Sequence, residues 1–223
     1  MKKILALIAC CAALSFMVPD SQFTYLALGD SYTIGTAIGK QNAYPVLLVD
    51  SMKKGLPNFY ADVDVIAKNG WTTRDLLNGI SKEKPKDPYD LVSLLIGVNN
   101  QYQHLSKAVY KTEFTELLEK SIALAGGKKE NVFVISIPDY GVCTVAVDNL
   151  ESISPDINAF NAINKSVAEA YGVSYVDITE ISRTAKGNES LIASDGLHFS
   201  SKMHELWVRE IMEKYMLVRL EGM

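Results

Sequence analysis

The 223-residue sequence has few of the residues that mark specialised classes of protein, with 3 cysteines, 3 histidines and 7 prolines. So few cysteines exclude a disulfide scaffold, and the modest glycine and proline content excludes a collagen-like chain. The sequence also has no excess of positive charge, since it contains 22 basic and 26 acidic residues. This balance argues against binding to a nucleic acid backbone, and we expect no nucleic acid partner. With 48% apolar residues, the composition is that of an ordinary globular domain.

Apolar residues are concentrated at the N-terminus. Lys2 and Lys3 precede the uncharged run Ile4–Val18, and Pro19 follows it. A basic start followed by about fifteen apolar residues is typical of a signal peptide, and the run is too short for a membrane-spanning helix. We therefore predict a leader over residues 1–19, although a buried N-terminal strand or helix would also account for the run.

Two kinds of cleavage fit this leader. Leu7-Ile8-Ala9-Cys10 resembles a bacterial lipobox, in which Cys10 would carry a lipid and provide the only attachment to a membrane. Cleavage further along by an ordinary signal peptidase would leave no such anchor. In both cases we expect an exported protein that is located in the bacterial periplasm, on the outer surface or outside the cell.

After the leader, short apolar runs alternate with helical patterns. The strands are predicted at residues 23–28, 63–67, 89–96, 132–137 and 173–178, and the helices at residues 44–54, 72–80, 107–125, 154–171 and 200–220. Alternating elements at these spacings predict one α/β domain over residues 20–223, with a five-stranded parallel sheet covered by helices on both faces. The fourth helix is expected to open at Ser154-Pro155, since proline suits a first helical turn.

In open parallel sheets, ligands bind beyond the carboxyl ends of the strands. The residues that follow the predicted strands are therefore the candidates for a functional site. Ser31 follows the first strand, and its hydroxyl becomes a strong nucleophile if a base removes the proton. His198 is the natural base, and Asp195 could accept the other imidazole N–H and orient the ring. Gly70 and Asn99 follow other strands and could provide an oxyanion hole, together with the backbone N–H of Ser31.

These blocks, taken together and in this order, resemble the SGNH (GDSL) hydrolase family. The matching segments are Gly29-Asp30-Ser31-Tyr32, Asn69-Gly70, Gly97-Val98-Asn99-Asn100 and Asp195-Gly196-Leu197-His198. The resemblance covers essentially the whole chain after the leader. It implies the three-layer α/β/α flavodoxin-like fold, a serine esterase or lipase mechanism, and no metal or cofactor.

The sequence departs from the family at two positions. Asn100 stands where the family commonly has Asp, and Phe199 stands where it commonly has Pro. Neither change removes a member of the triad or of the oxyanion hole, so we still expect activity.

Side chains near these blocks are candidates for contact with the substrate. They are Trp71, Asn100, Gln101, Tyr102 and Tyr140. The alternative is core packing for Trp71 and Tyr140, and a solvated loop position for the other three.

The remaining noteworthy residues have plainer interpretations. We expect His104 to be a polar loop residue rather than a zinc ligand, and His204 to be exposed or half-buried. Cys143 is expected to be a packed thiol, and Asp30 to hold its loop by accepting backbone N–H groups.

The sequence thus predicts a serine esterase that removes small acyl groups, such as acetyl, from a carbohydrate or a similar small-molecule ester. A lysophospholipase or acyl thioesterase is the alternative with the same chemistry. A catalytically weak glycan- or lipid-binding protein is the alternative outside catalysis. No protein partner is predicted.

Overall fold

The structure is a computed structural model that describes residues 22–55, 59–86, 88–145 and 150–221. The predicted leader over residues 1–19, with Cys10, lies outside the described residues. Within them, no helix is both long enough and apolar enough to cross a membrane.

The centre of the molecule is a five-stranded, fully parallel sheet with the strand order β2-β1-β3-β4-β5. The strands are β1 (Phe23–Gly29), β2 (Ala61–Ala67), β3 (Leu91–Leu95), β4 (Val132–Ile135) and β5 (Ser174–Val176). This arrangement confirms the predicted five-stranded parallel sheet. It places the loops after β1, β2 and β3 side by side at one edge, because these three strands are neighbours.

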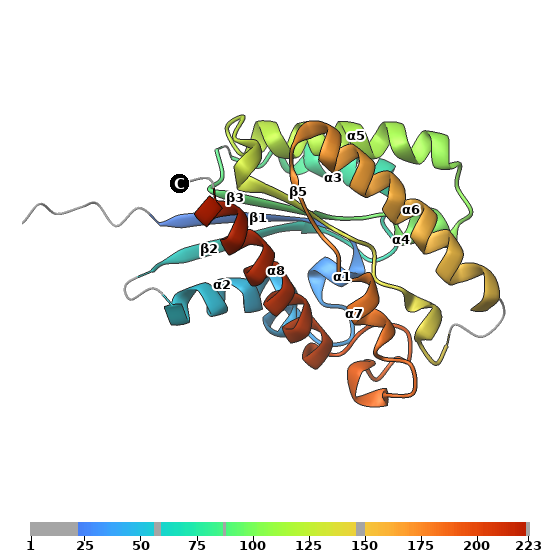
Figure 1. Ribbon diagram of the computed structural model, residues 1–223. Helices are drawn as coiled ribbons and strands as arrows, with labels where there is room; N and C mark the ends of the chain where they lie inside the picture. Colours follow the sequence, from blue (N-terminus) through green and yellow to red (C-terminus); the bar gives the residue numbers. More distant parts are fainter. Residues whose placement is uncertain (1–21, 56–58, 87, 146–149, 222–223) are drawn as a thin grey trace, which may run out of the picture.

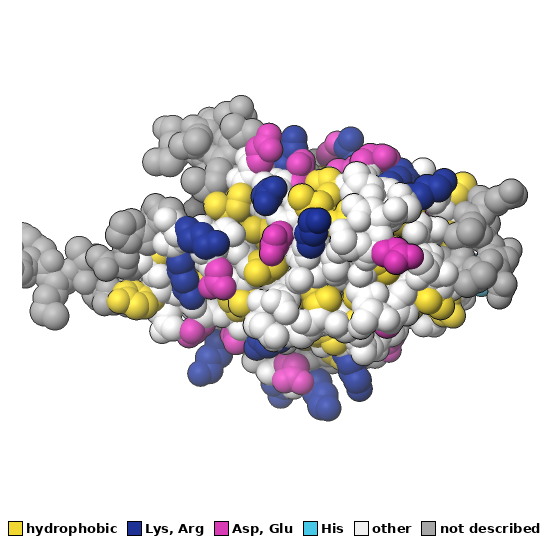
Figure 2. Space-filling view, turned by 90° about the horizontal axis from the view of Figure 1, so that it is seen from below, with side chains coloured by type: hydrophobic (Ala, Val, Ile, Leu, Met, Phe, Trp, Pro, Cys, Tyr) yellow, Lys and Arg dark blue, Asp and Glu magenta, His cyan; other side chains and the backbone are white. Residues whose placement is uncertain are grey.

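Helices cover both faces of the sheet, as Figure 1 shows. One face carries α3 (Thr73–Glu83), α5 (Lys107–Leu124) and α6 (Leu150–Tyr171), and the other carries α2 (Tyr44–Gly55) and α8 (Ser201–Glu221). The predicted three-layer α/β/α architecture is therefore confirmed. On the α2 and α8 side, acidic and basic side chains are interspersed over the surface (Figure 2).

Short helices gather at the carboxyl ends of the strands (Figure 1). These are α1 (Ser31–Ile34), α4 (Val98–Tyr102) and α7 (Thr179–Arg183). The 3-10 turns are η1 (Lys40–Asn42), η2 (Lys129–Asn131), η3 (Tyr140–Val142) and η4 (Glu189–Leu191).

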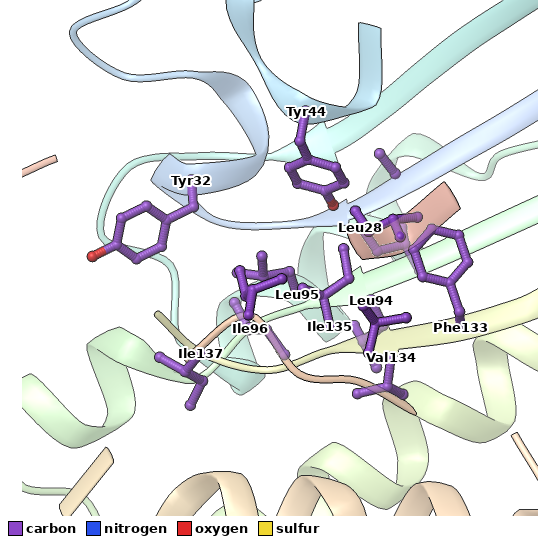
Figure 3. Packing of buried hydrophobic residues seen from close by; sticks show 14 of the residues in the cluster. Leu28, Tyr32, Tyr44, Leu94, Leu95, Ile96, Phe133, Val134, Ile135 and Ile137 are labelled. Carbon is purple, nitrogen blue, oxygen red and sulfur yellow. The ribbon is translucent and has the colours of Figure 1, made fainter. Parts of the chain in front are cut away.

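The burial of each strand follows from its sequence. All residues of β3 and β4 are buried, as expected for near-continuous apolar runs covered on both faces. Along the edge strand β2, exposed and partly buried residues alternate instead, and Asp62 and Asp64 lie on the exposed side. Charged residues on an edge strand discourage pairing with another chain. Figure 3 shows Leu94, Ile135 and neighbouring side chains packed between the layers.

Two helix starts illustrate how local sequence acts. Thr72 and Asp75 form a reciprocal capping box at the start of α3. The start of α6 was predicted wrongly, because the helix begins at Leu150 and Pro155 lies inside it. Pro155 falls only in the second turn, so its missing N–H removes a single backbone hydrogen bond near the helix end.

Candidate active site

Ser31 lies where β1 turns into the one-turn helix α1. Asp30 caps this helix by accepting the backbone N–H of Tyr32 at 3.1 Å, and Gly35 closes it by donating to the Ser31 carbonyl at 3.2 Å. Gly35 has φ +76°, a left-handed conformation that glycine adopts without strain. The Ser31 side chain is thus carried on a closed, capped turn at the end of the sheet.

The carboxyl group of Asp30 is completely buried beside this serine. One oxygen, Oδ1, accepts the Tyr32 N–H, and Oδ2 has no hydrogen-bond partner in the described part of the chain. Burial raises the pKa of Asp30 to about 7, against the opposing effect of the Tyr32 hydrogen bond. The placement agrees with the expectation that Asp30 holds the turn.

His198 lies on a loop between η4 and α8 that doubles back on itself. Ala193 donates its N–H to the His198 carbonyl at 2.8 Å, and Ser200 donates to the Leu191 carbonyl at 2.9 Å. These bonds flank an antiparallel bridge between Ile192 and Phe199. The segment Asp195–His198 is therefore the tip of a short two-stranded ribbon, which fixes its backbone.

Asp195 and His198 form a close pair at this tip. Asp195 Oδ2 lies 2.6 Å from His198 Nδ1, while Oδ1 accepts the backbone N–H groups of Leu197 at 3.0 Å and His198 at 2.9 Å. Partial burial would raise the pKa of Asp195, but these hydrogen bonds outweigh it and hold the pKa below its usual value. The ionised carboxylate favours the tautomer with a proton on Nδ1, which leaves Nε2 free to act as a base.

The turn that carries Ser31 and the loop that carries His198 meet through Tyr32. The rings of Tyr32 and His198 stand edge to face with centroids 5.7 Å apart. Because Tyr32 directly follows Ser31, the structure brings Ser31 and His198 to the same part of the sheet edge. Among the described residues, no hydrogen bond joins the Ser31 hydroxyl to the imidazole. Such contacts are often long in an enzyme without substrate.

Gly70 lies beside this turn, in the loop after β2. It has φ +77°, and a Cβ atom built on it would meet nothing within 4 Å. Asn69 accepts a hydrogen bond from the hydroxyl of Thr36, which follows α1, so the loops after β1 and β2 are joined by their side chains. Gly70 is exposed, so its N–H lies on a loop that solvent and substrate can reach.

Asn99 stands in the first turn of α4, after β3. Its Nδ2 donates to the Trp71 carbonyl at 2.9 Å, which ties the loops after β2 and β3 together. A primary amide carries two N–H groups, so one remains for a ligand. Gly97 precedes this turn at φ +129°, and a Cβ there would approach the Tyr110 hydroxyl to 2.3 Å. Only glycine permits this close passage of the backbone.

Asn100 and Gln101 are placed differently from the sequence-based expectation. Asn100 is 1% exposed, accepts the Thr73 N–H at 3.0 Å and donates to the Thr73 hydroxyl at 2.8 Å. Gln101 is also buried and accepts a hydrogen bond from Tyr140 at 2.8 Å. Both side chains point into the protein and bond to other protein groups, so neither faces a substrate. A short loop sequence gives no signal that separates such inward amides from outward ones.

Three other candidates lie nearer the surface of the site. Tyr102 is 67% exposed and stands edge-on to Tyr140, with ring centroids 6.4 Å apart. Tyr140 itself is largely buried. Trp71 is half-buried, and its ring lies so close to Gly79 of α3 that a Cβ there would meet it at 2.4 Å. Of these, Tyr102 offers the most surface to a ligand.

The other two histidines and Cys143 occupy a loop position or buried positions. His104 is exposed at φ +54°, in agreement with a loop residue. The expectation for His204 was wrong, because it is 1% exposed and its Nδ1 accepts the Tyr44 N–H at 3.1 Å. Burial lowers the pKa of His204 to about 3. Cys143 is buried, and burial raises the pKa of its thiol to about 12.

Asp139 anchors the loop after β4. It is fully buried, accepts the Gly141 N–H at 2.9 Å and pairs with Arg183 of α7 at 2.9 Å. The loop after β4 contacts the segment Asp195–His198, because Thr144 and Val145 both donate to the Gly196 carbonyl at 3.1 Å. The described residues contain no cluster of side chains suited to hold a metal ion.

The sequence profile of the GDSL-like lipase/acylhydrolase family matches residues 27–206. An isoamyl acetate-hydrolyzing esterase of Schizosaccharomyces pombe is 28% identical over 167 residues, and the alignment covers 70% of this chain and 64% of that protein. This chain therefore spans less than two thirds of the length of that relative.

Solved structures are similar over most of the chain. A lipase/acylhydrolase from Enterococcus faecalis matches with a TM-score of 0.62 and 26% identity, covering 86% of this chain and 94% of the other. An acetylxylan esterase from Geobacillus stearothermophilus matches with a TM-score of 0.67 and 19% identity over the same shares. At the latter identity, the likeness shows a common fold.

Proposed function

The chain belongs to the GDSL-like lipase/acylhydrolase family, and on this basis we propose that it is a carboxylic ester hydrolase with Ser31 as its nucleophile. The observation that carries the proposal is the pair of Asp195 and His198, held on a fixed ribbon against the residue that follows Ser31.

In the proposed mechanism, Ser31 Oγ attacks the ester carbonyl carbon while His198 Nε2 takes the hydroxyl proton. The carbonyl oxygen becomes an oxyanion, which the N–H groups of Ser31 and Gly70 and the amide of Asn99 stabilise. The bond to the leaving alcohol then breaks, and His198 returns the proton to the alcohol oxygen. Water attacks the acyl-enzyme in the same manner, which releases the acid and restores Ser31.

Hydrolysis of p-nitrophenyl acetate and butyrate by the full chain tests this mechanism. Ser31→Ala should abolish hydrolysis above background and prevent labelling by a fluorophosphonate probe. Ser81→Ala is the matched control, because Ser81 is exposed on α3 and its hydroxyl, within the described chain, bonds only to the Leu77 carbonyl. Equal rates for the wild type and Ser31→Ala would contradict the proposal. A folded wild type that the probe leaves unlabelled would favour a binding protein instead.

We further propose that the substrate carries a small acyl group, such as acetyl, on a carbohydrate or another alcohol. The names of an isoamyl acetate-hydrolyzing esterase and an acetylxylan esterase among the relatives support the acetyl part. The exposed ring of Tyr102 suits the face of a sugar. A series of p-nitrophenyl esters from acetate to palmitate, followed by acetate release from acetylated xylan, tests this choice. Activity that rises with chain length and extends to lysophospholipids or acyl thioesters would support the alternative.

Export is also a proposal, supported by the charge and hydropathy pattern of residues 1–19. The mass of the N-terminal peptide of protein produced in a bacterial host would reveal the cleavage site and any lipid on Cys10. An intact Met1 in the mature, active protein would contradict export through this leader.

A further inference from the structure

The residue that follows the proposed nucleophile and the residue that follows the proposed base lie in contact with each other. Tyr32 directly follows Ser31, and Phe199 directly follows His198, at a position where the family commonly has Pro. The rings of Tyr32 and Phe199 have centroids 5.9 Å apart. Both are enclosed, with Tyr32 at 3% exposure and Phe199 at 0%.

Trp207 of α8 completes the group behind these two rings. Its centroid lies 6.1 Å from Tyr32 and 5.5 Å from Phe199, and both contacts are edge to face. The indole is fully buried, and its N–H has no hydrogen-bond partner in the described part of the chain. An unpaired buried N–H costs free energy, so the position of this ring is determined by packing rather than by its polar atom.

The three rings connect the nucleophile to the base. Tyr32 belongs to the capped turn that carries Ser31, whereas Phe199 belongs to the ribbon that carries His198. His198 presents its imidazole to the ring of Tyr32. In Figure 3, Tyr32 projects beyond the strand ends, while the ring of Tyr44 points toward the sheet.

We propose that Tyr32 is a positioning residue, whose ring, backed by Phe199 and Trp207, sets the placement of the His198 imidazole relative to Ser31. This inference rests on the proposed function, since it assigns a role in the same site. Asp195 fixes the tautomer and one edge of the imidazole. The Tyr32 ring limits the tilt of the His198 imidazole on a side that Asp195 does not contact, so that Nε2 stays directed at the turn that carries Ser31.

Steady-state kinetics on p-nitrophenyl acetate test the proposal. Removing the ring in Tyr32→Leu should lower kcat between about tenfold and a hundredfold, with KM within about twofold of the wild type, because misplacement of a catalytic group acts on the transition state. Tyr32→Phe keeps the ring and should restore kcat to within about twofold. Unchanged kcat in Tyr32→Leu, or a Tyr32→Phe variant as slow as Tyr32→Leu, would overturn the proposal.

Phe114→Leu separates positioning from general stability. Phe114 is a fully buried ring on α5, on the opposite side of the sheet. Its replacement should lower the melting temperature and leave kcat unchanged. A kcat loss in Phe114→Leu as large as that in Tyr32→Leu would show a loss of stability only, and would overturn the proposal.

Phe199→Leu provides a second route if Tyr32→Leu does not fold, because it removes the support and leaves Tyr32 in place. It should lower kcat in the same manner, and an unchanged kcat would count against the proposal. Failure of this inference differs from failure of the proposed function. In the first case the wild type hydrolyses esters and reacts with a fluorophosphonate, and in the second it does neither.

Discussion

Asp195 binds both the backbone and the side chain of His198. Its Oδ1 accepts the His198 backbone N–H at 2.9 Å, and its Oδ2 lies 2.6 Å from His198 Nδ1. One carboxylate therefore sets the position of the loop and the tautomer of the ring together. Because its pKa is lowered, this carboxylate is ionised throughout the neutral range.

Asp195→Asn tests whether Asp195 sets the tautomer of the His198 ring, and it leaves the hydrogen bonds that position the loop intact. The amide oxygen can still accept the two backbone N–H groups, but its NH2 group would face Nδ1 and favour the tautomer that lacks a basic Nε2. We expect kcat to fall by about a hundredfold or more, yet less than on removal of Ser31 or His198. Circular dichroism should show an intact fold. A variant that keeps wild-type kcat would contradict the assigned orientation.

Gly70→Ala probes the proposed oxyanion hole. The added Cβ meets no atom, so the substitution acts through the backbone, which must either keep a strained φ of +77° or move the N–H. Gly127→Ala is the matched control, since Gly127 has φ +78°, equally open surroundings and a position between α5 and β4. Both variants should lose about 1 kcal/mol of stability. Only Gly70→Ala should lose activity, and an equal activity loss in the two would argue against a catalytic N–H at Gly70.

Asp30 should make the stability of the protein depend on pH. The folded state raises its pKa to about 7, so between the ordinary carboxyl value and pH 7 the folded protein holds a proton that the unfolded chain releases. Stability attributable to this group is therefore present at low pH and is lost as pH rises toward 7, by about 1.4 kcal/mol per pH unit. Asp30→Asn keeps an acceptor for the Tyr32 N–H and cannot ionise. Urea unfolding at pH 5 and pH 7.5 should show that the free energy of unfolding of the variant increases relative to that of the wild type at the higher pH. The same difference between the two proteins at both pH values would refute the assignment.

Cys143 should be chemically inert despite lying near the base loop. Burial raises the pKa of the thiol to about 12, so almost none of it is thiolate at pH 8. We expect the peptide that contains Cys143 to remain unmodified by iodoacetamide in the native protein and to be alkylated in urea. Cys143→Ala should retain esterase activity. Rapid native alkylation accompanied by inactivation would show that this thiol belongs to the reactive site.

The sequence predicts the sheet and the chemical groups at its edge because both depend on local patterns. The run Leu91–Leu95 is apolar throughout and forms a fully buried strand, and Thr72 caps its helix through a hydroxyl three residues from the N–H that it accepts. Asp195 and His198 are also near in sequence, so their pairing requires only a tight turn.

The properties that the sequence does not predict depend on distant partners. The burial of His204 follows from Tyr44, which lies on another helix, and the inward orientation of Asn100 follows from Thr73. The four residues that precede Ser154 join α6 in spite of a proline signal for a later start. For His204 and Asn100, a partner that is distant in the sequence decides the position of the side chain.

The contact between Tyr32 and His198 also has a consequence for the order of folding. Ser31 follows the first strand and His198 precedes the last helix, so the site joins segments from near the two ends of the described chain. Loop closure over so long a separation is favourable only after the intervening strands have assembled. Ester hydrolysis should therefore be among the last properties to return during refolding, and no earlier than the fluorescence change that reports burial of Trp207, because Trp207 packs against the same two segments.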